Sequence, residues 1–378
     1  MRKEESTLDL AIELIAKPSI TPDDAGCQDL IIERLQKAGF IIHSLPFDNV
    51  KNFWAIRGDE GPMVCFAGHT DVVPPGSEDL WESPPFAPEI RNGYLYGRGA
   101  SDMKSSLAAM VVATELFIEE RPSHSGRIAF LLTSDEEGVA EYGTKFVVEW
   151  LRAQNIIPDW CIVGEPTSEN VFGDVIKHGR RGSLNGVFRA FGTQGHVAYP
   201  ENAENPIHAS LAALNELTQE IWDEGCAHFQ PTSLQISNIH AGDGITNVIP
   251  ALCEAHFNIR YSTKLYADEI KNRTSTILDK HNFDYAIDWK LSGKPFLTKA
   301  NTLVSNLKEA VLEITGNTPK LSTTGGTSDA RFIATLTPEV IEFGPINASI
   351  HQANERIAVG DLEKLTEIYR NVLLKLVL

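Results

Sequence analysis

The sequence predicts an α/β fold: a mostly parallel sheet flanked by helices, with a smaller α+β domain inserted into the chain. Two observations lead to this prediction. Short apolar runs alternate with helical stretches in the first half of the chain, which is typical of a parallel sheet covered by helices. From about Gly179 onward, apolar and polar residues alternate within the runs, which is typical of half-exposed strands.

Two helices are predicted at the start of the chain. Residues 6–17 carry apolar side chains on one helical face, and Pro18 follows, where proline ends a helix. Residues 27–38 repeat this pattern, and Gly39 stands where a glycine commonly closes a helix.

Three apolar runs, at 63–67, 128–132 and 161–163, predict the central strands. Each run is nearly continuous, so we expect both faces of these strands to be buried beneath helices. Helical stretches at 103–119 and 145–153 separate the runs. Strand and helix therefore alternate as a parallel sheet requires.

The segment from Gly179 to about 292–293 is predicted to form the inserted α+β domain. Its strands and helices are expected at 183–191, 206–220, 233–240, 253–261 and 267–280. The helix at 206–220 has a proline in its first turn, a position that tolerates it.

The chain then returns to the first domain. We expect a helix at 302–315, a glycine-threonine loop at 323–329, a strand at 339–343 and a last helix that Asp361 caps. The buried stripe of that helix is predicted to comprise Leu362, Leu365, Tyr369, Val372 and Leu376.

Composition excludes several classes of protein. The chain has 378 residues and a net charge of −18, which disfavours a nucleic-acid partner because phosphates would be repelled. No apolar run approaches the roughly 20 residues that span a bilayer. The acidic, amphipathic start lacks a signal-peptide core, and the five cysteines form no CxxC pair. We therefore expect a cytoplasmic enzyme that binds neither nucleic acid nor membrane.

Polar residues gather where the three predicted strands end. His69 and Asp71 follow the first run, the acidic residues 135–137 follow the second, and Glu165 follows the third. The carboxyl ends of strands in an open α/β sheet are where binding crevices form. We therefore expect these side chains to face one crevice.

The residue types at this edge suggest a metal site. His69 and Asp71 are two residues apart, so both can face the same side of an extended segment. The adjacent carboxylates at 135–137 repel one another unless a counter-charge such as a divalent metal is present. Asp102 either caps the following helix or bridges two cations, and Ser101 is an alternative cap.

Taken together, the segments HTD, GRGASDMK, SDEEG and GEPT and a late histidine at 351 resemble those of the co-catalytic zinc aminoacylase and carboxypeptidase family. Segments 177–183, 195–200 and 324–329 are similar to its desuccinylase branch. The resemblance covers nearly the whole chain and implies a zinc-exopeptidase-like fold. It also implies that residues 1–178 and 293–378 form a catalytic domain and 179–292 a lid and dimerisation domain.

The resemblance implies specific roles for individual residues. His69 and Glu165 would hold one zinc, Glu137 and His351 the other, and Asp102 would bridge them. Co²⁺ or Mn²⁺ also suits such ligands. The remaining catalytic residues would be Glu136 as general base, Asp71 orienting His69, and His196 acting across the interface of a homodimer.

The implied reaction is hydrolysis of N-succinyl-LL-2,6-diaminopimelate to succinate and LL-2,6-diaminopimelate in lysine and cell-wall precursor synthesis. Substrate-binding positions would be Arg180, Asn247, Arg260, Gly326, Thr327 and Asn347. This chain has Thr246 where many desuccinylases have an asparagine. The alternatives are an acetylornithine deacetylase or dipeptidase of the same family, or a catalytically silent metal-binding scaffold protein.

Overall fold

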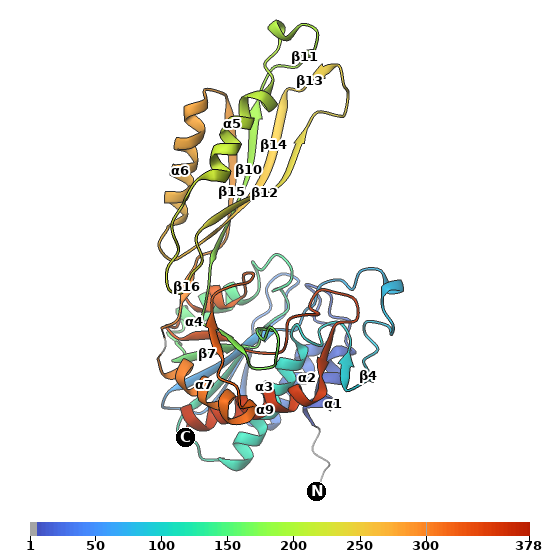
Figure 1. Cartoon of the computed structure of the whole chain (residues 1–378). Coiled ribbons are helices and arrows are strands. Elements are labelled where there is room, and N and C mark those ends of the chain that lie inside the picture. Colours follow the sequence, from blue (N-terminus) through green and yellow to red (C-terminus); the bar gives the residue numbers. More distant parts are fainter. Residues whose placement is uncertain (1–5, 300) are drawn as a thin grey trace. The chain divides into compact units, whose positions relative to one another are not determined.

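A computed structural model describes residues 6–299 and 301–378 of the chain (Figure 1). The described residues divide into two compact units. Unit 1 runs to Gly179 and takes in Thr298–Ser322 and Ser328–Leu378, whereas unit 2 comprises Arg180–Leu297 and Thr323–Thr327. The predicted lid and dimerisation roles of the inserted domain stay predictions.

Unit 1 is built around a mixed sheet with the strand order β1-β2-β6-β3-β7-β18-β8-β17. Its central strands β6, β3, β7 and β18 run parallel, and β2 pairs antiparallel with β6. The bounds are β1 (Ile41–Ser44), β2 (Asn52–Arg57), β3 (Met63–His69), β6 (Arg127–Thr133), β7 (Trp160–Val163), β8 (Val175–Lys177), β17 (Lys320–Ser322) and β18 (Val340–Glu342). The three predicted central strands are confirmed.

Helices cover both faces of this sheet. Helices α1, α2, α3, α7 and α9 share one hydrophobic core with it, and α4 and α8 pack against the other face. The bounds are α1 (Thr7–Ile15), α2 (Cys27–Lys37), α3 (Lys104–Glu120), α4 (Thr144–Ala153), α7 (Thr302–Thr315), α8 (Ala330–Ile333) and α9 (Val359–Leu376). The predicted α/β class is therefore confirmed.

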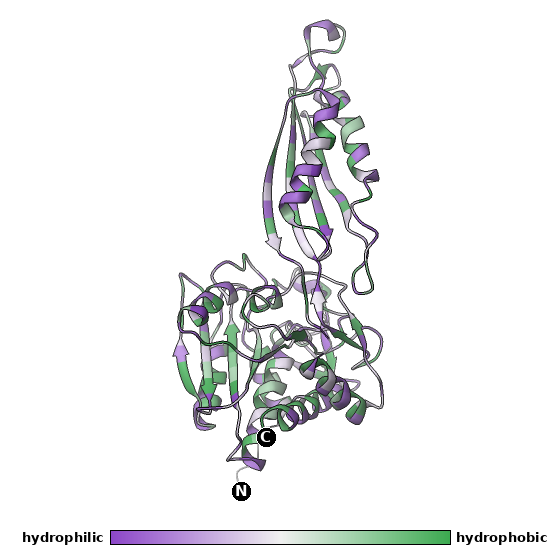
Figure 2. Cartoon of the chain, turned by 90° about the vertical axis from the view of Figure 1, so that its left-hand side faces the viewer, coloured by the Kyte–Doolittle hydropathy of each residue, from purple (hydrophilic) through white to green (hydrophobic). Residues whose placement is uncertain are grey.

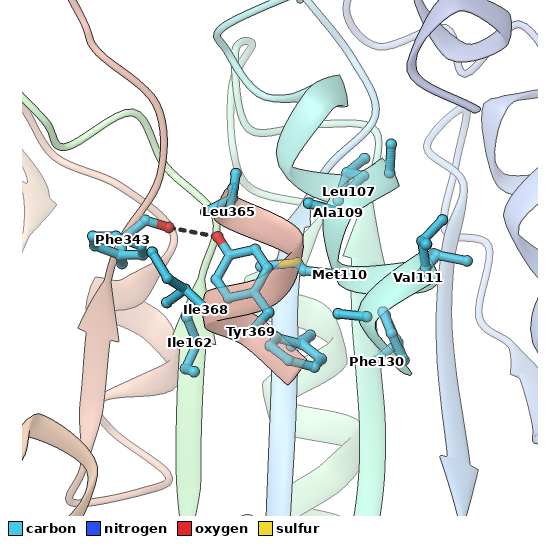
Figure 3. Packing of buried hydrophobic residues seen from close by; sticks show 14 of the residues in the cluster. Leu107, Ala109, Met110, Val111, Phe130, Ile162, Phe343, Leu365, Ile368 and Tyr369 are labelled. Atoms are coloured by element: carbon cyan, nitrogen blue, oxygen red, sulfur yellow. Dashed lines mark hydrogen bonds between the residues drawn. The ribbon is translucent and has the colours of Figure 1, made fainter. Parts of the chain in front are cut away.

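The core of unit 1 explains the nearly continuous apolar runs. All seven residues of β3 are buried, and Figure 2 shows the strands of this sheet largely in the hydrophobic colour. Figure 3 shows α3, β6, β7 and α9 meeting around Tyr369, whose hydroxyl donates a hydrogen bond to the carbonyl oxygen of Phe343 at 2.6 Å. The predicted stripe on the last helix is buried along its length.

The start of α9 differs from the prediction. The helix begins at Val359, and Asp361 lies inside its first turn, where its carboxylate accepts a hydrogen bond from Lys364 at 3.1 Å. Ala358 occupies the N-cap position because strand β19 (Arg356–Ala358) runs directly into the helix. The N–H of Val359, at the start of the helix, donates to the carbonyl oxygen of Gly93 at 3.0 Å. Tertiary contact thus replaces the side-chain cap.

Unit 2 is an antiparallel sheet with the order β12-β14-β10-β15. Helices α5 and α6 pack together and contribute to a core on one face of the sheet (Figure 1). Buried and partly exposed residues alternate along β14, as the sequence pattern predicts. The bounds are β10 (Gly182–Phe191), α5 (Pro206–Gln219), β12 (Ser233–Ala241), β14 (Leu252–Tyr261), α6 (Ala267–Leu278) and β15 (Tyr285–Gly293).

Short elements complete the fold. The remaining strands are β4 (Glu89–Arg91), β5 (Tyr94–Tyr96), β9 (Gly179–Arg180), β11 (Gly195–His196), β13 (Val248–Ile249) and β16 (Phe296–Leu297), and the 3-10 helices are η1 (Glu78–Leu80), η2 (Pro200–Asn202) and η3 (Asp279–His281). Among the described residues, we find no helix with the length and apolar character needed to cross a bilayer.

Candidate metal centre

Polar side chains meet at the carboxyl edge of the central strands of unit 1. His69 ends β3, Glu165 follows β7, and the acidic segment 135–137 follows β6. These strands are parallel neighbours in the sheet, so their carboxyl ends lie at the same edge. The arrangement brings together groups that are far apart in the sequence.

Two loops bring the remaining predicted ligands to this edge. Asp102 stands directly before α3, whose N-cap is Met103 without a side-chain hydrogen bond. Neither Asp102 nor Ser101 therefore acts as the helix cap. His351 lies between β18 and β19 with a backbone φ of +59°, a conformation that is uncommon for residues other than glycine and is often retained at functional sites.

Asp102 lies between two pairs, each made of a histidine and a carboxylate. Its Oδ1 is 3.3 Å from Nε2 of His69, and its Oδ2 is 3.5 Å from Nε2 of His351. His69 Nε2 is 3.8 Å from Oε1 of Glu165, and His351 Nε2 is 3.0 Å from Oε1 of Glu137. All the predicted metal ligands therefore lie together.

The spacing and burial of these atoms fit divalent ions. Two ligand atoms about 2.0–2.1 Å from a tetrahedral zinc are about 3.3 Å apart, close to the distances around Asp102. His69 Nε2 and Asp102 Oδ1 are buried and make no hydrogen bond within the described chain. A buried polar atom without a partner carries a large desolvation cost, which coordination of a cation would offset.

The electrostatics show that the cluster lacks positive charge. Burial lowers the pKa of His69, but the neighbouring carboxylates, Asp102 first, outweigh it and raise that pKa well above the ordinary value. Hydrogen bonds to Asp102 and Glu137 raise the pKa of His351 to about 10. Protons on these histidines partly compensate the carboxylates in the protein alone, and divalent cations would compensate them more fully.

Asp71 connects His69 to the acidic loop. The backbone oxygen of Asp71, rather than its carboxylate, lies 2.8 Å from His69 Nδ1, while the carboxylate is 3.6 Å away. That carboxylate accepts hydrogen bonds from the backbone N–H of Glu136 at 3.3 Å and of Glu137 at 3.1 Å. Asp71 thus contacts both His69 and the segment that carries the predicted base.

Glu136 lies beside the first histidine pair. A carboxylate oxygen of Glu136 and ligand atoms of His69 and Glu165 lie within 4.8 Å of one another. Burial, followed by repulsion from the Glu165 carboxylate, raises the pKa of Glu136 well above its usual range. An ionised Glu136 would therefore depend on nearby positive charge.

Asp135 differs from its two acidic neighbours. Its carboxylate accepts backbone N–H groups of Val139, Glu141 and Tyr142, each at 3.1 Å. The side chain therefore stabilises the turn that follows, so its charge is compensated without a metal.

Unit 2 contains a cluster of three arginines. Burial lowers the pKa of Arg260, and the charges of Arg181 and Arg180 lower it further. Arg260 Nη1 and Arg181 Nε are buried atoms without a hydrogen-bond partner among the described residues. Arg180 and Arg260 are among the residues predicted from the sequence, whereas Arg181, which directly follows Arg180 in the chain, is not.

The loop at 323–327 packs against this cluster. Arg180 Nη1 donates to the carbonyl oxygen of Thr324 at 2.8 Å. Gly325 has a φ of +102°, and a Cβ at this position would collide with Arg180 Nη1. By contrast, Gly326 has open space around its Cβ position, and Thr327 is partly exposed.

The other residues predicted to bind substrate or to act in catalysis lie outside the arginine cluster. Asn347 belongs to unit 1, and its N–H donates to the carbonyl oxygen of Ser168 at 2.9 Å. His196 and Asn247 lie together at the β11–β13 pairing of unit 2, where both are exposed. Their predicted roles in binding and catalysis stay predictions.

Comparison with known proteins agrees with this geometry. The model of peptidase family M20/M25/M40 matches residues 65–375. A protein named succinyl-diaminopimelate desuccinylase from Thiobacillus denitrificans is 58% identical over 370 residues, covering 98% of this chain and 94% of the relative. A protein with the same name from Stutzerimonas stutzeri is 56% identical, covering 98% and 97%.

Solved structures support the fold. The M20 family metallo-carboxypeptidase Sso-CP2 from Sulfolobus solfataricus aligns with a TM-score of 0.81 at 18% identity, covering 100% of this chain and 99% of that one. The architecture and the family match lead to the same assignment. This chain is a member of peptidase family M20/M25/M40.

Proposed function

We propose that the chain is a di-zinc amidohydrolase that cleaves N-succinyl-LL-2,6-diaminopimelate to succinate and LL-2,6-diaminopimelate. The observation that carries this proposal is the position of Asp102 between the two histidine–carboxylate pairs. The substrate is taken from relatives at 56–58% identity that are named for this reaction. The reaction serves lysine and cell-wall precursor synthesis, and we infer a cytoplasmic location.

The ligand roles follow from the two pairs. His69 and Glu165 would hold one zinc, Glu137 and His351 would hold the other, and Asp102 would contribute one oxygen to each. Bound zinc supplies a Lewis acid for the substrate carbonyl and a water of lowered pKa. Co²⁺ and Mn²⁺ also suit these ligands.

Glu136 is the general base in this proposal. It is adjacent to Glu137 in the chain and lies near His69 and Glu165, so it can reach a water held at the centre. It would take the proton of the attacking water and pass it to the leaving amine. Asp71 supports this step because it fixes the backbone N–H groups of Glu136 and Glu137.

The arginine cluster would bind the carboxylates of the substrate. N-succinyl-diaminopimelate carries several negative charges, and an arginine side chain can bind a carboxylate with two parallel hydrogen bonds. The unpartnered atoms of Arg260 and Arg181 support this assignment. Gly326, Thr327, Asn347 and Asn247 would add further contacts, with Thr246 changing the pocket only locally.

We further infer a homodimer in which His196 stabilises the reacting carbonyl oxygen of the partner copy. In support, His196 is exposed and lies beside exposed Val197 and Tyr199. A surface with such side chains would be covered in a dimer.

Steady-state kinetics test the substrate. We expect kcat/KM for N-succinyl-LL-2,6-diaminopimelate to exceed that for N-acetylornithine by more than about 100-fold, because only the former offers extra carboxylates to the arginines. Metal-depleted protein is the control. A preference for N-acetylornithine would reject the proposed substrate, and no turnover of any amide by metal-loaded protein would favour a scaffold role.

A further inference from the structure

A buried carboxylate behind the metal centre has no assigned role. Glu355 is 1% exposed. Its Oε1 accepts the backbone N–H groups of Ser101 at 2.8 Å and Asp102 at 2.9 Å. Its Oε2 accepts the N–H of Gly99 at 3.0 Å and Nη1 of Arg98 at 2.7 Å. Glu355 therefore fixes the backbone of Asp102 directly.

The same residue joins two loops that carry proposed metal ligands. The segment 97–102 contains Asp102, and the segment 346–355 contains His351. Further hydrogen bonds link these segments: the N–H of Gly97 to the Glu355 carbonyl at 3.0 Å, and the Ser101 hydroxyl to the Ile346 carbonyl at 2.8 Å. Glu355 is thus at the centre of the contact between the loops.

The surroundings of Glu355 require a carboxylate. All four groups that contact the Glu355 carboxylate are hydrogen-bond donors. The NH₂ group of a glutamine at this position would therefore face backbone N–H groups. Gly99 has a φ of +85°, and a Cβ there would press on Lys104 and Val72. Glycine therefore allows the N–H groups of this loop to converge on one anion.

Charge balance distinguishes Glu355 from the proposed metal ligands. Arg98, 2% exposed, pairs with Glu355, so the pair adds no net charge to the centre. Burial raises the pKa of Glu355, and the charge of Asp102 raises it further. Both oxygens of Glu355 are occupied by donors, and neither is available to a cation.

We propose that Glu355 is a positioning residue of the metal centre, which sets the affinity for the metal ions by fixing Asp102 relative to His351. This inference rests on the proposed function, because it assumes that Asp102 bridges two ions. Residues behind the ligands commonly control metal affinity in this way.

The test is calorimetric titration of metal-free protein with Zn²⁺ alone. We expect the variant Glu355→Gln to weaken at least one of the two binding steps by about 10–100-fold. Glu115→Gln is the matched control, since it breaks the partly buried Arg34–Glu115 pair, 2.6 Å long, between α2 and α3. The control should lower the melting temperature but leave both affinities within about twofold.

A second variant and a second readout keep the test decisive. If Glu355→Gln does not fold, Glu355→Asp keeps the charge with a shorter reach and should show a smaller loss of affinity. The visible absorption of Co²⁺-loaded protein should change with either variant at Glu355 and not with Glu115→Gln. Unchanged zinc affinities and an unchanged Co²⁺ spectrum would overturn the inference, whereas wild-type protein that binds fewer than two ions would overturn the proposed function itself.

Discussion

The ligand cluster of unit 1 and the arginine cluster of unit 2 each gather charges of mainly one sign. In unit 1, carboxylates surround His69 and His351, and in unit 2 the charges of Arg181 and Arg180 add to burial in lowering the pKa of Arg260. Like charges held together in partial burial are costly unless a ligand of opposite sign binds. This charge pattern supports the proposed binding of cations at the first cluster and of substrate carboxylates at the second.

The two clusters differ in how their geometry is fixed. The carboxylates and histidines of unit 1 have short side chains, and their loops are fixed by backbone N–H groups that donate to the carboxylates of Asp71 and Glu355. The arginines of unit 2 have long side chains and lie on different elements: Arg180 ends β9, Arg181 lies between β9 and β10, and Arg260 is on β14. The fixed loops of unit 1 suit a metal ion, which requires set ligand distances. The long arginine side chains of unit 2 suit the carboxylates of a substrate.

Removal of metal should have the largest effect and tests the cationic half of this comparison. Dialysis against a chelator should lower kcat by more than about a thousandfold, because the lowered pKa of bound water is lost. Addition of Zn²⁺ should restore turnover, and metal content measured by mass spectrometry checks the loading. Full activity in protein shown to be free of metal would mean that the carboxylate cluster serves another purpose.

Glu136→Gln should have the next largest effect. The substitution removes the proposed base while keeping the shape, so kcat should fall by about 10²–10⁴-fold, with both metal ions retained. The measurement combines steady-state kinetics with metal analysis. Glu141→Gln is the control, because Glu141 lies on the same loop and pairs with half-exposed Lys145; it should change kcat by less than about twofold. Unchanged turnover in Glu136→Gln would refute the role of base.

Arg260→Met should have a smaller effect and tests the anionic half of the comparison. Loss of a charged hydrogen bond to a substrate carboxylate should raise KM by about 10–100-fold, with a smaller change in kcat. Arg189→Met is the matched control variant, since Arg189 lies on the neighbouring strand β10 and pairs with Glu254 and Asp288. Equal KM values for wild type and Arg260→Met would remove Arg260 from the substrate site.

The sequence predicts the fold well where the signal is local. The apolar runs of β3, β6 and β7 and the stripe of α9 depend on residue type and period alone. The cap of α9 does not, because the carbonyl of distant Gly93 takes the place of the predicted Asp361.

The same limit applies to the site. The segments that carry the ligands are recognisable from the sequence, but nothing in 135–137 tells which carboxylate faces the centre. The turn after Asp135 decides this, since its N–H groups turn that side chain away. Arg181 gains its neighbour Arg260 only through the pairing of β10 with β14, in which Ser183 faces Arg260. Glu355 likewise acts through a loop more than 250 residues away in sequence.

The pH dependence of stability should show the smallest effect and separates the two clusters. Hydrogen bonds to Asp102 and Glu137 raise the pKa of His351 to about 10, above the ordinary 6.5. Its contribution to stability in metal-free protein is therefore fully present below pH 6.5 and lost as the pH rises through about 10. Because His351 is half exposed, solvent screens the effect, and the melting temperature should fall by only about 2–4 °C.

Zinc-loaded protein and the variant His351→Asn should show a weaker dependence of melting temperature on pH, since neither holds this proton. The arginines keep their protons throughout this range and should contribute nothing. Calorimetric melting across the range provides the measurement, and a metal-free wild type whose melting temperature holds or rises would show that His351 carries no proton at this centre.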